Sequence, residues 1–252
     1  MHVVGLWRYP VKSMQGEALE TAVLAFPGLS GDRRYGVRDD ASGRILSAKR
    51  EGRLLTAHAA TDARIGVRIR LPTGPTIDGP GPATDAALSA WLGRPVSLVE
   101  AEPSVVPTFE SQSDMADDDS ASVTWQGHPE AFVDSSPVHL LTTASLRAAA
   151  AQRPELDWSV ARFRPNLLVD VADDGRVEDA WVGRRVSIDG VHLEVIKGCE
   201  RCVMVTRPQP GGLDRQFGVL THLAEVAHST IGVLARVLRT GTVTVGSAVA
   251  LD

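Results

Sequence analysis

Short runs in which apolar and polar residues alternate recur along most of this 252-residue chain. Alternation with a period of two is typical of a half-buried β-strand. It predicts strands over residues 2–9, 19–24, 34–39, 64–71, 95–100, 138–141, 167–170, 181–186 and 187–196, and two closing strands between 232 and 246. Turn residues separate many of these runs at intervals of about eight to twelve positions, which favours a β-barrel or a β-sandwich.

Helical patterns are fewer. The segment Asp85–Leu92 combines a capping residue with helix formers, and Gly93 follows it as a stop. Thr142 or Thr143 is expected to cap a second helix that ends near Gln152, and residues 220–229 predict a helix or an ordered loop. The sequence therefore predicts a mostly β protein with a few helices, of the α+β class.

Residues 104–130 differ from the segments on either side. They are poor in large apolar side chains, they show no periodicity, and they contain the acidic run Asp114–Ser120. This composition is typical of a flexible loop or a linker. We therefore expect one domain over residues 1–103, an acidic flexible linker over 104–130, and a second domain over 131–252.

Overall composition restricts the classes of partner. A hydrophobic content of 43% and a mean hydropathy of −0.03 are ordinary for a soluble globular protein. The formal net charge of −5 gives no reason to expect non-specific binding to nucleic acid. No stretch approaches the roughly 18–20 apolar residues that a membrane span needs. We expect a cytoplasmic protein without a nucleic-acid or membrane partner.

Candidate chemistry is concentrated at the only two cysteines, Cys199 and Cys202, which form a C-x-x-C motif. The motif follows the strand predicted over residues 187–196, and a strand end that leads into a loop is a common place for a functional site. Lys197 and Arg201 flank the thiols, and positive charge favours a reactive or metal-binding thiolate.

Four interpretations of this motif are open at the level of the residues. They are a dithiol redox pair, half of a zinc site, one thiolate bound to a soft metal, and two buried structural cysteines. A zinc site would need two further ligands, and the chain has no third cysteine and no pair of histidines at ligand spacing. A thioredoxin-like pair would begin a helix, whereas residues 203–206 predict continued β structure.

Five short segments occur in an order that resembles the MOSC family. They are Arg8–Ser13, Gly31–Tyr35, Asp134–Pro137, Phe163–Asn166 and Cys199–Cys202. The pattern is similar in particular to the mitochondrial amidoxime-reducing component and its bacterial counterparts, and the resemblance covers roughly residues 2–250. It implies a MOSC β-barrel fold preceded by a smaller N-terminal MOSC β-barrel domain.

The resemblance also implies a molybdenum–molybdopterin cofactor (Mo-MPT) in which the protein supplies one thiolate. By motif position, Cys202 is the metal ligand and the catalytic residue, and a soft metal favours such a ligand. The positions that the resemblance assigns to cofactor binding are Lys12, Ser13, Arg33, Ser135, Ser136, Arg164, Asn166, Glu200 and Arg201. Arginine offers a rigid fork of donors for oxyanions, and asparagine offers a donor and an acceptor to a heterocycle.

Other roles stay open for three of these positions. Lys12 could be a solvated charge in a turn. Arg33 could pair with Asp32 or Asp39. Asn166 could cap a turn after the preceding proline.

The activity that the resemblance implies is reduction of N-hydroxylated small molecules such as amidoximes and hydroxylamines. Because the chain has no flavin, haem or iron–sulfur motif, we expect electrons from a separate protein, either a flavin reductase or a small iron–sulfur or haem carrier. Two other functions stay open. One is a non-redox module that binds or delivers the molybdenum cofactor or carries sulfur on Cys202. The other is an enzyme specialised for one substrate of a natural-product pathway.

One departure from the family pattern keeps these alternatives open. Relatives with reductase activity often continue after the second cysteine with the pattern T-x-V-D-P. Here Thr206 is followed by Arg207 and Pro208, and the acidic residue is absent.

Overall fold

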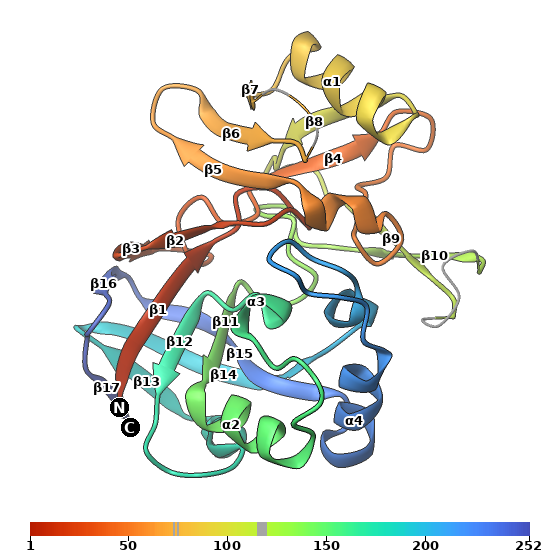
Figure 1. The fold of residues 1–252 in the computed structure, drawn as a ribbon. Helices are drawn as coiled ribbons and strands as arrows, with labels where there is room; N and C mark the ends of the chain where they lie inside the picture. The colour runs from red at the N-terminus through yellow and green to blue at the C-terminus, as the bar shows by residue number, and fades with distance from the viewer. Residues whose placement is uncertain (73, 75, 115–119) are drawn as a thin grey trace. The chain divides into compact units, whose positions relative to one another are not determined.

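The computed structural model describes residues 1–72, 74, 76–114 and 120–252 (Figure 1). The chain forms two compact units that interleave along the sequence. The unit that we call the barrel unit comprises Met1–Trp7, Ala18–Ser30 and Ser136–Asp252, and the inserted unit comprises Arg8–Glu17 and Gly31–Ser135. The sequence predicts domains over residues 1–103 and 131–252, joined by a linker over 104–130. That division of the sequence stays a prediction.

An eight-stranded sheet forms the barrel unit, in the order β17-β13-β14-β15-β11-β12-β1-β2 (Figure 1). The strands are β1 His2–Arg8, β2 Glu17–Leu19, β11 Val138–Thr142, β12 Leu167–Asp170, β13 Arg185–Ile188, β14 Val191–Glu200, β15 Thr230–Arg239 and β17 Val249–Leu251. The sheet curls so that its β1 and β17 ends approach each other. The Val3 amide donates to the Ser247 carbonyl at 3.0 Å, and the Val249 amide donates to the Met1 carbonyl at 3.0 Å. Closure satisfies backbone groups that a free edge would expose.

Alternation along these strands places apolar side chains inside the barrel. Val138, Val169, Leu193 and Val233 are among the fully buried members of this core. Strands β3 (Thr21–Leu24) and β16 (Gly241–Thr244) pair with each other and add further apolar side chains to the core. Burial of this apolar surface is the main stabilising contribution to the unit, at roughly 25 cal/mol per Å².

Three helices of the barrel unit share a second apolar core. They are α2 (Thr143–Gln152), α3 (Val160–Phe163) and α4 (Phe217–Ala227). The same unit also contains a short 3-10 helix, η2 (Val177–Trp181). Helix α2 begins where the sequence predicts, because the Thr142 hydroxyl accepts a hydrogen bond from the Ser145 amide at 3.1 Å. The residues of the second core are Leu141, Ala149, Trp158, Phe163, Val205, Val219, Leu223 and Ile231.

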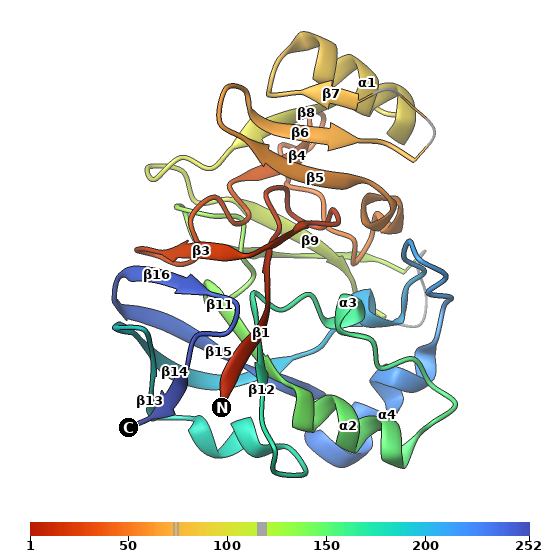
Figure 2. The same cartoon turned by 60° about the vertical axis from the view of Figure 1, so that its left-hand side comes forward.

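The inserted unit contains smaller sheets and one helix (Figure 2). Its elements are the antiparallel pair β4 (Tyr35–Asp39) and β8 (Val96–Glu100), the three-stranded sheet β5 (His58–Asp62), β6 (Gly66–Arg70) and β7 (Thr76–Asp78), the 3-10 helix η1 (Gly52–Thr56), and α1 (Pro82–Leu92). Helix α1 begins at Pro82, because proline fits the first helical position. The predicted cap, Asp85, instead accepts a hydrogen bond from the Leu98 amide at 2.8 Å.

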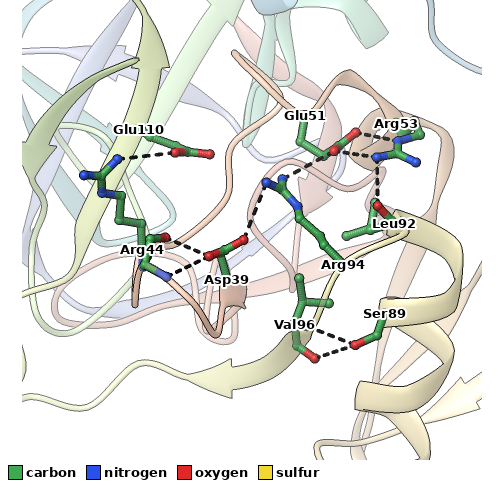
Figure 3. Close-up of polar contacts among 10 residues, drawn as sticks. Asp39, Arg44, Glu51, Arg53, Ser89, Leu92, Arg94, Val96 and Glu110 are labelled. Carbon is green, nitrogen blue, oxygen red and sulfur yellow. Dashed lines mark hydrogen bonds and ion pairs between the residues drawn. The ribbon is translucent and has the colours of Figure 1, made fainter. Parts of the chain in front are cut away.

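A network of ion pairs joins α1 to the loops beneath it (Figure 3). Arg94, in the turn between α1 and β8, lies 3.5 Å from the Asp39 carboxylate and 3.4 Å from that of Glu51. Arg53 also pairs with Glu51 at 2.7 Å. The arginines are exposed whereas the two carboxylates are largely buried, and we interpret this network as fixing the position of the turn.

The segment predicted as a linker contains two paired strands. β9 (Thr108–Gln112) and β10 (Ser122–Gln126) form an antiparallel pair. The Phe109 ring is fully buried and packs edge-on against Trp125, with ring centroids 5.5 Å apart. Two aromatic side chains carry the packing here, which explains why low apolar content hid the strands from sequence analysis. Residues 115–119 of the acidic run lie outside the described residues.

Two further predictions need correction. The strand pair predicted over 181–196 is the hairpin β13–β14, whose two-residue turn is Asp189–Gly190 with φ of 47° and 82°. Residues 203–206, predicted as β, form the 3-10 helix η3 (Val203–Thr206). Because β15 begins at Thr230, opposite Glu200, no partner strand is available beyond the end of β14.

Within the described part of the chain, no helix has both the length and the apolar character needed to cross a bilayer.

Candidate functional site

The two cysteines lie on either side of the end of β14. The pairing of β14 with β15 shifts register between Gly198 and Glu200, where Cys199 lies opposite two residues of β15, Ile231 and Gly232. The extra residue of this β-bulge is therefore on β15, where Gly232 has a φ of 75°. Bulges change the direction of side chains and are frequent beside functional sites. The two cysteines do not form a disulfide; Cys199 is buried, with 7% of its surface exposed, and Cys202 is half-buried. Cys202 is therefore the more accessible of the two thiols.

Arg201 lies between the cysteines and turns back toward Cys199. One terminal nitrogen donates to Cys199 Sγ at 2.9 Å, and the other donates to the Phe163 carbonyl at 2.9 Å. The guanidinium therefore contacts Cys199, whereas the sequence suggested an effect on Cys202. Among the described residues, Arg201 Nε is buried and has no hydrogen-bond partner. A buried donor without an acceptor is costly, so this atom suits an acceptor on a bound molecule.

A second arginine, Arg162 of α3, supports the turn that follows Cys202. Its side chain is fully buried. It donates to the Val205 carbonyl at 3.3 Å and to the Asp214 carbonyl at 2.9 Å. Burial lowers the pKa of its guanidinium, and the negative charges of Asp157 and Asp214 oppose that shift. Sequence analysis missed this residue, although a charge between the apolar Ala161 and Phe163 was the available signal.

Arg164 and Asn166 are both buried at the start of β12. Arg164 ends α3 in the left-handed region, with φ of 54°. The Asn166 side chain accepts a hydrogen bond from the His139 amide at 3.1 Å and donates to the Trp7 carbonyl at 3.3 Å. These contacts connect β11 with β1, so the side chain does more than cap a local turn.

In the inserted unit, Lys12 belongs to a cluster of charged residues. It is 6% exposed, so it is not a solvated turn charge. Its ammonium donates to the Phe132 carbonyl at 3.0 Å and forms an ion pair with Asp134, and Lys49 pairs with the same carboxylate at 2.9 Å. Burial lowers the pKa of Lys12; Asp134 opposes the shift, and the charges of Lys49 and Arg33 add to it.

Arg33 forms an ion pair with Asp32, as one of the open alternatives proposed. Its guanidinium also lies over the Tyr9 ring, 4.6 Å from the centroid. Burial opposes the charged form, but Asp32 outweighs that effect and the pKa of Arg33 is raised. With Lys12 and Lys49, the cluster holds three cations and two carboxylates, and this excess of positive charge suits an anion.

The carboxylate of Asp134 is expected to make stability depend on pH. Burial opposes its ionised form, but Lys12 and Lys49 outweigh that effect and hold its pKa well below the ordinary value of 3.8. Its stabilising contribution is therefore complete above about pH 4 and falls as the pH drops toward the lower folded-state pKa. Because 39% of this side chain is exposed, we expect D134N to lower the free energy of unfolding by only about 1 kcal/mol at pH 7.

Urea unfolding of the wild type and D134N at pH 7 and pH 3 measures this effect, and the difference between them should shrink at pH 3. D78N removes an exposed carboxylate that pairs with Arg68 and serves as the control. A difference that is equal at both pH values would contradict the assignment.

The remaining predicted residues are placed as follows. The Ser13 hydroxyl accepts a hydrogen bond from the Ala48 amide at 2.9 Å. Ser135 and Ser136 are half-buried, and Glu200 is exposed. The inserted unit holds Lys12, Ser13, Arg33 and Ser135, and the barrel unit holds Ser136, Arg164, Asn166, Glu200, Arg201 and Cys202.

Backbone conformation sets three of these residues apart. Ser13, Arg33 and Arg164 have φ values of 68°, 48° and 54°. Positive φ is uncommon for residues other than glycine, and such strained conformations cluster at functional sites. Sequence analysis singled out all three for their side chains, and it had no means of detecting this feature of their backbone.

The donor set around Cys202 limits the kind of metal site. Among the described residues, no group of three or more histidine, cysteine, aspartate or glutamate side chains could hold a metal ion. A closed structural zinc site needs four such ligands. A metal bound to Cys202 would therefore have to bring most of its other ligands with it, as a metal chelated by an organic dithiolene does.

A separate cavity of about 770 Å³ lies within the inserted unit. Arg38 and Asp40 line it on one side, and Val99 and Val105 are among its apolar lining residues. None of the residues predicted from the sequence lines this cavity, so we do not assign it to the cofactor.

Comparison with known proteins places the whole chain in a family context. The MOSC domain matches residues 127–250, and the MOSC N-terminal beta barrel domain matches residues 1–104. Mitochondrial amidoxime reducing component 2 of Bos taurus is 26% identical over 237 residues, which cover 84% of this chain and 68% of the relative. The protein of the same name from Rattus norvegicus is 33% identical over 92 residues, which cover 36% of this chain and 26% of that relative.

Among solved structures, the YUAD protein from Bacillus subtilis aligns with 99% of this chain and 94% of its own, with a TM-score of 0.46 and 10% identity. The two domain matches together extend over nearly the whole sequence, in the order that the five motifs predict. They confirm the predicted α+β, strand-rich fold class. The chain belongs to the MOSC family, with a MOSC N-terminal beta barrel domain followed by a MOSC domain.

Proposed function

We propose that this protein is a molybdenum-cofactor-dependent oxidoreductase that reduces N-hydroxylated small molecules such as amidoximes and hydroxylamines. Family membership supports the proposal, since the MOSC family includes molybdenum-dependent reductases and the chain is distantly similar to amidoxime reducing components. The observation that carries it is the half-buried thiol of Cys202 just after β14, next in sequence to Arg201, whose Nε is a buried donor.

The residues around Cys202 fit a group that supplies its own ligands. Mo-MPT, when bound, supplies dithiolene sulfurs and two-electron redox chemistry. Cys202 would hold the metal, and Arg201 and Arg164 would bind polar atoms of the cofactor.

The proposed reaction converts an N–OH group and two protons and two electrons into an N–H group and water. We propose that the electrons come from a separate flavin reductase or a small iron–sulfur or haem carrier, because the sequence has no motif for those cofactors. We propose a cytoplasmic location for the same protein. The protein's own contribution is to hold the metal through Cys202 and to fix the charges beside it.

Metal analysis and turnover together test this proposal. Protein from a host that synthesises molybdenum cofactor is expected to contain stoichiometric molybdenum and pterin, and to reduce benzamidoxime with an artificial reductant. Full molybdenum content without benzamidoxime turnover would contradict the reductase activity. Absence of molybdenum, together with sulfane sulfur on Cys202, would favour the alternative of a sulfur carrier.

A further inference from the structure

The side chain of Arg201 is fixed from two directions. The thiol sulfur of Cys199 and the carbonyl of Phe163, at the end of α3, each accept a hydrogen bond of 2.9 Å from it. Sulfur is a weak acceptor, but a charged donor strengthens such a bond. The result is a contact that connects the end of β14 with the end of α3, directly before Cys202.

Cys199 lies in β14 opposite the extra residue of β15, where the backbone is closely packed. Gly198 allows a close approach to Thr230, since an added Cβ would lie 3.2 Å from the Thr230 methyl carbon. Arg176 donates to the Thr230 hydroxyl at 2.7 Å, and the Arg201 amide donates to the Ser229 carbonyl at 2.7 Å. The backbone on both sides of Cys199 is therefore fixed, and the Cys199 side chain is buried while Cys202 is half-buried.

We propose that Cys199 is a positioning residue, whose sulfur holds the Arg201 guanidinium in place and thereby orders the loop that carries Cys202. The importance of this loop for a bound cofactor rests on the proposed function. The order itself does not, because the contacts belong entirely to the protein. With its terminal nitrogens bonded to Cys199 and Phe163, Arg201 keeps Nε as the donor available to a bound group.

Two small substitutions distinguish a hydrogen-bonding role of Cys199 from a role in packing alone. C199S keeps an acceptor at the position but adds polarity to a buried site. C199A keeps the site apolar and removes the acceptor. If the sulfur acts as an acceptor, serine should be the better replacement. If it only fills space, alanine should be tolerated at least as well as serine.

The test uses the full chain without cofactor, because C199S and C199A each leave Cys202 as the only thiol. The measured quantity is the rate at which iodoacetamide alkylates Cys202 under native conditions, followed by mass spectrometry of the Cys202 peptide. We expect C199S to match the wild type within about twofold and C199A to react about tenfold faster, as loss of one charge-assisted hydrogen bond loosens the loop. Equal rates in the two variants would overturn the proposal.

The same measurement in an R201Q background shows whether Arg201 transmits the effect. The difference between serine and alanine at position 199 should then disappear, as expected for two residues that act through one contact. A difference that persists in R201Q would overturn the proposal. Urea midpoints of all variants establish that the folded state is being compared. Because the alkylation rates are measured without molybdenum, their outcome is independent of the proposed function.

Discussion

Substitution of Cys202 by serine is expected to remove bound molybdenum and to lower benzamidoxime reduction by at least about 100-fold. Even residues that only support a metal ligand typically change affinity or activity by about 10–100-fold, and loss of the ligand itself should exceed that range. A serine hydroxyl is a hard ligand and replaces a soft thiolate poorly. The loss should therefore be one of metal binding.

The control variant C199S shows whether the loss of molybdenum is specific to Cys202. C199S removes the neighbouring thiol of the same motif and should retain molybdenum. The fold should be little affected by C202S, because Cys202 is half-buried and the change is nearly isosteric. The free energy of unfolding of C202S, measured by urea titration, should thus agree with that of the wild type within about 0.5 kcal/mol, and the same titration establishes that C199S is folded. Full molybdenum content in C202S, or its loss in C199S, would contradict the assignment of the metal ligand.

Strands with many apolar residues were predictable from the sequence. The run Val138–Leu141 is buried along its length, and β11 covers Val138–Thr142. The helix after it was equally clear, because Thr142 is both the predicted and the observed cap. The pair β9–β10 was harder to predict, because β9 has Phe109 as its one apolar residue and the alternation in β10 extends over only five positions.

The site was predictable as a set of motifs but not as a set of contacts. The strand end at the C-x-x-C motif followed from alternation in β14. The contact of Arg201 with Cys199 lies beside a register shift in the pairing of β14 with β15, and the spacing of the residues does not indicate such a shift. The short turn after Cys202 was taken for a strand, because Val203 and Val205 favour β structure wherever a partner strand exists.

Arg162 is the residue outside the predicted set whose removal should cost the most stability. R162M is expected to lower the free energy of unfolding by about 3 kcal/mol, because the Val205 and Asp214 carbonyls lose a fully buried donor. Methionine keeps most of the side chain's length and relieves the desolvation of a buried charge, which limits the loss.

Urea unfolding of R162M and R147M at pH 7 provides the comparison. Arg147 is exposed and also donates to two backbone carbonyls, those of Val171 and Asp173, so R147M matches the chemistry without the burial. The control should lose no more than about 1 kcal/mol, because water can replace an exposed donor. Since the Val205 carbonyl belongs to the turn that begins at Cys202, R162M should also expose Cys202 to alkylation faster than R147M does. Equal stability losses in the two variants would show that burial of Arg162 is not what makes its hydrogen bonds important.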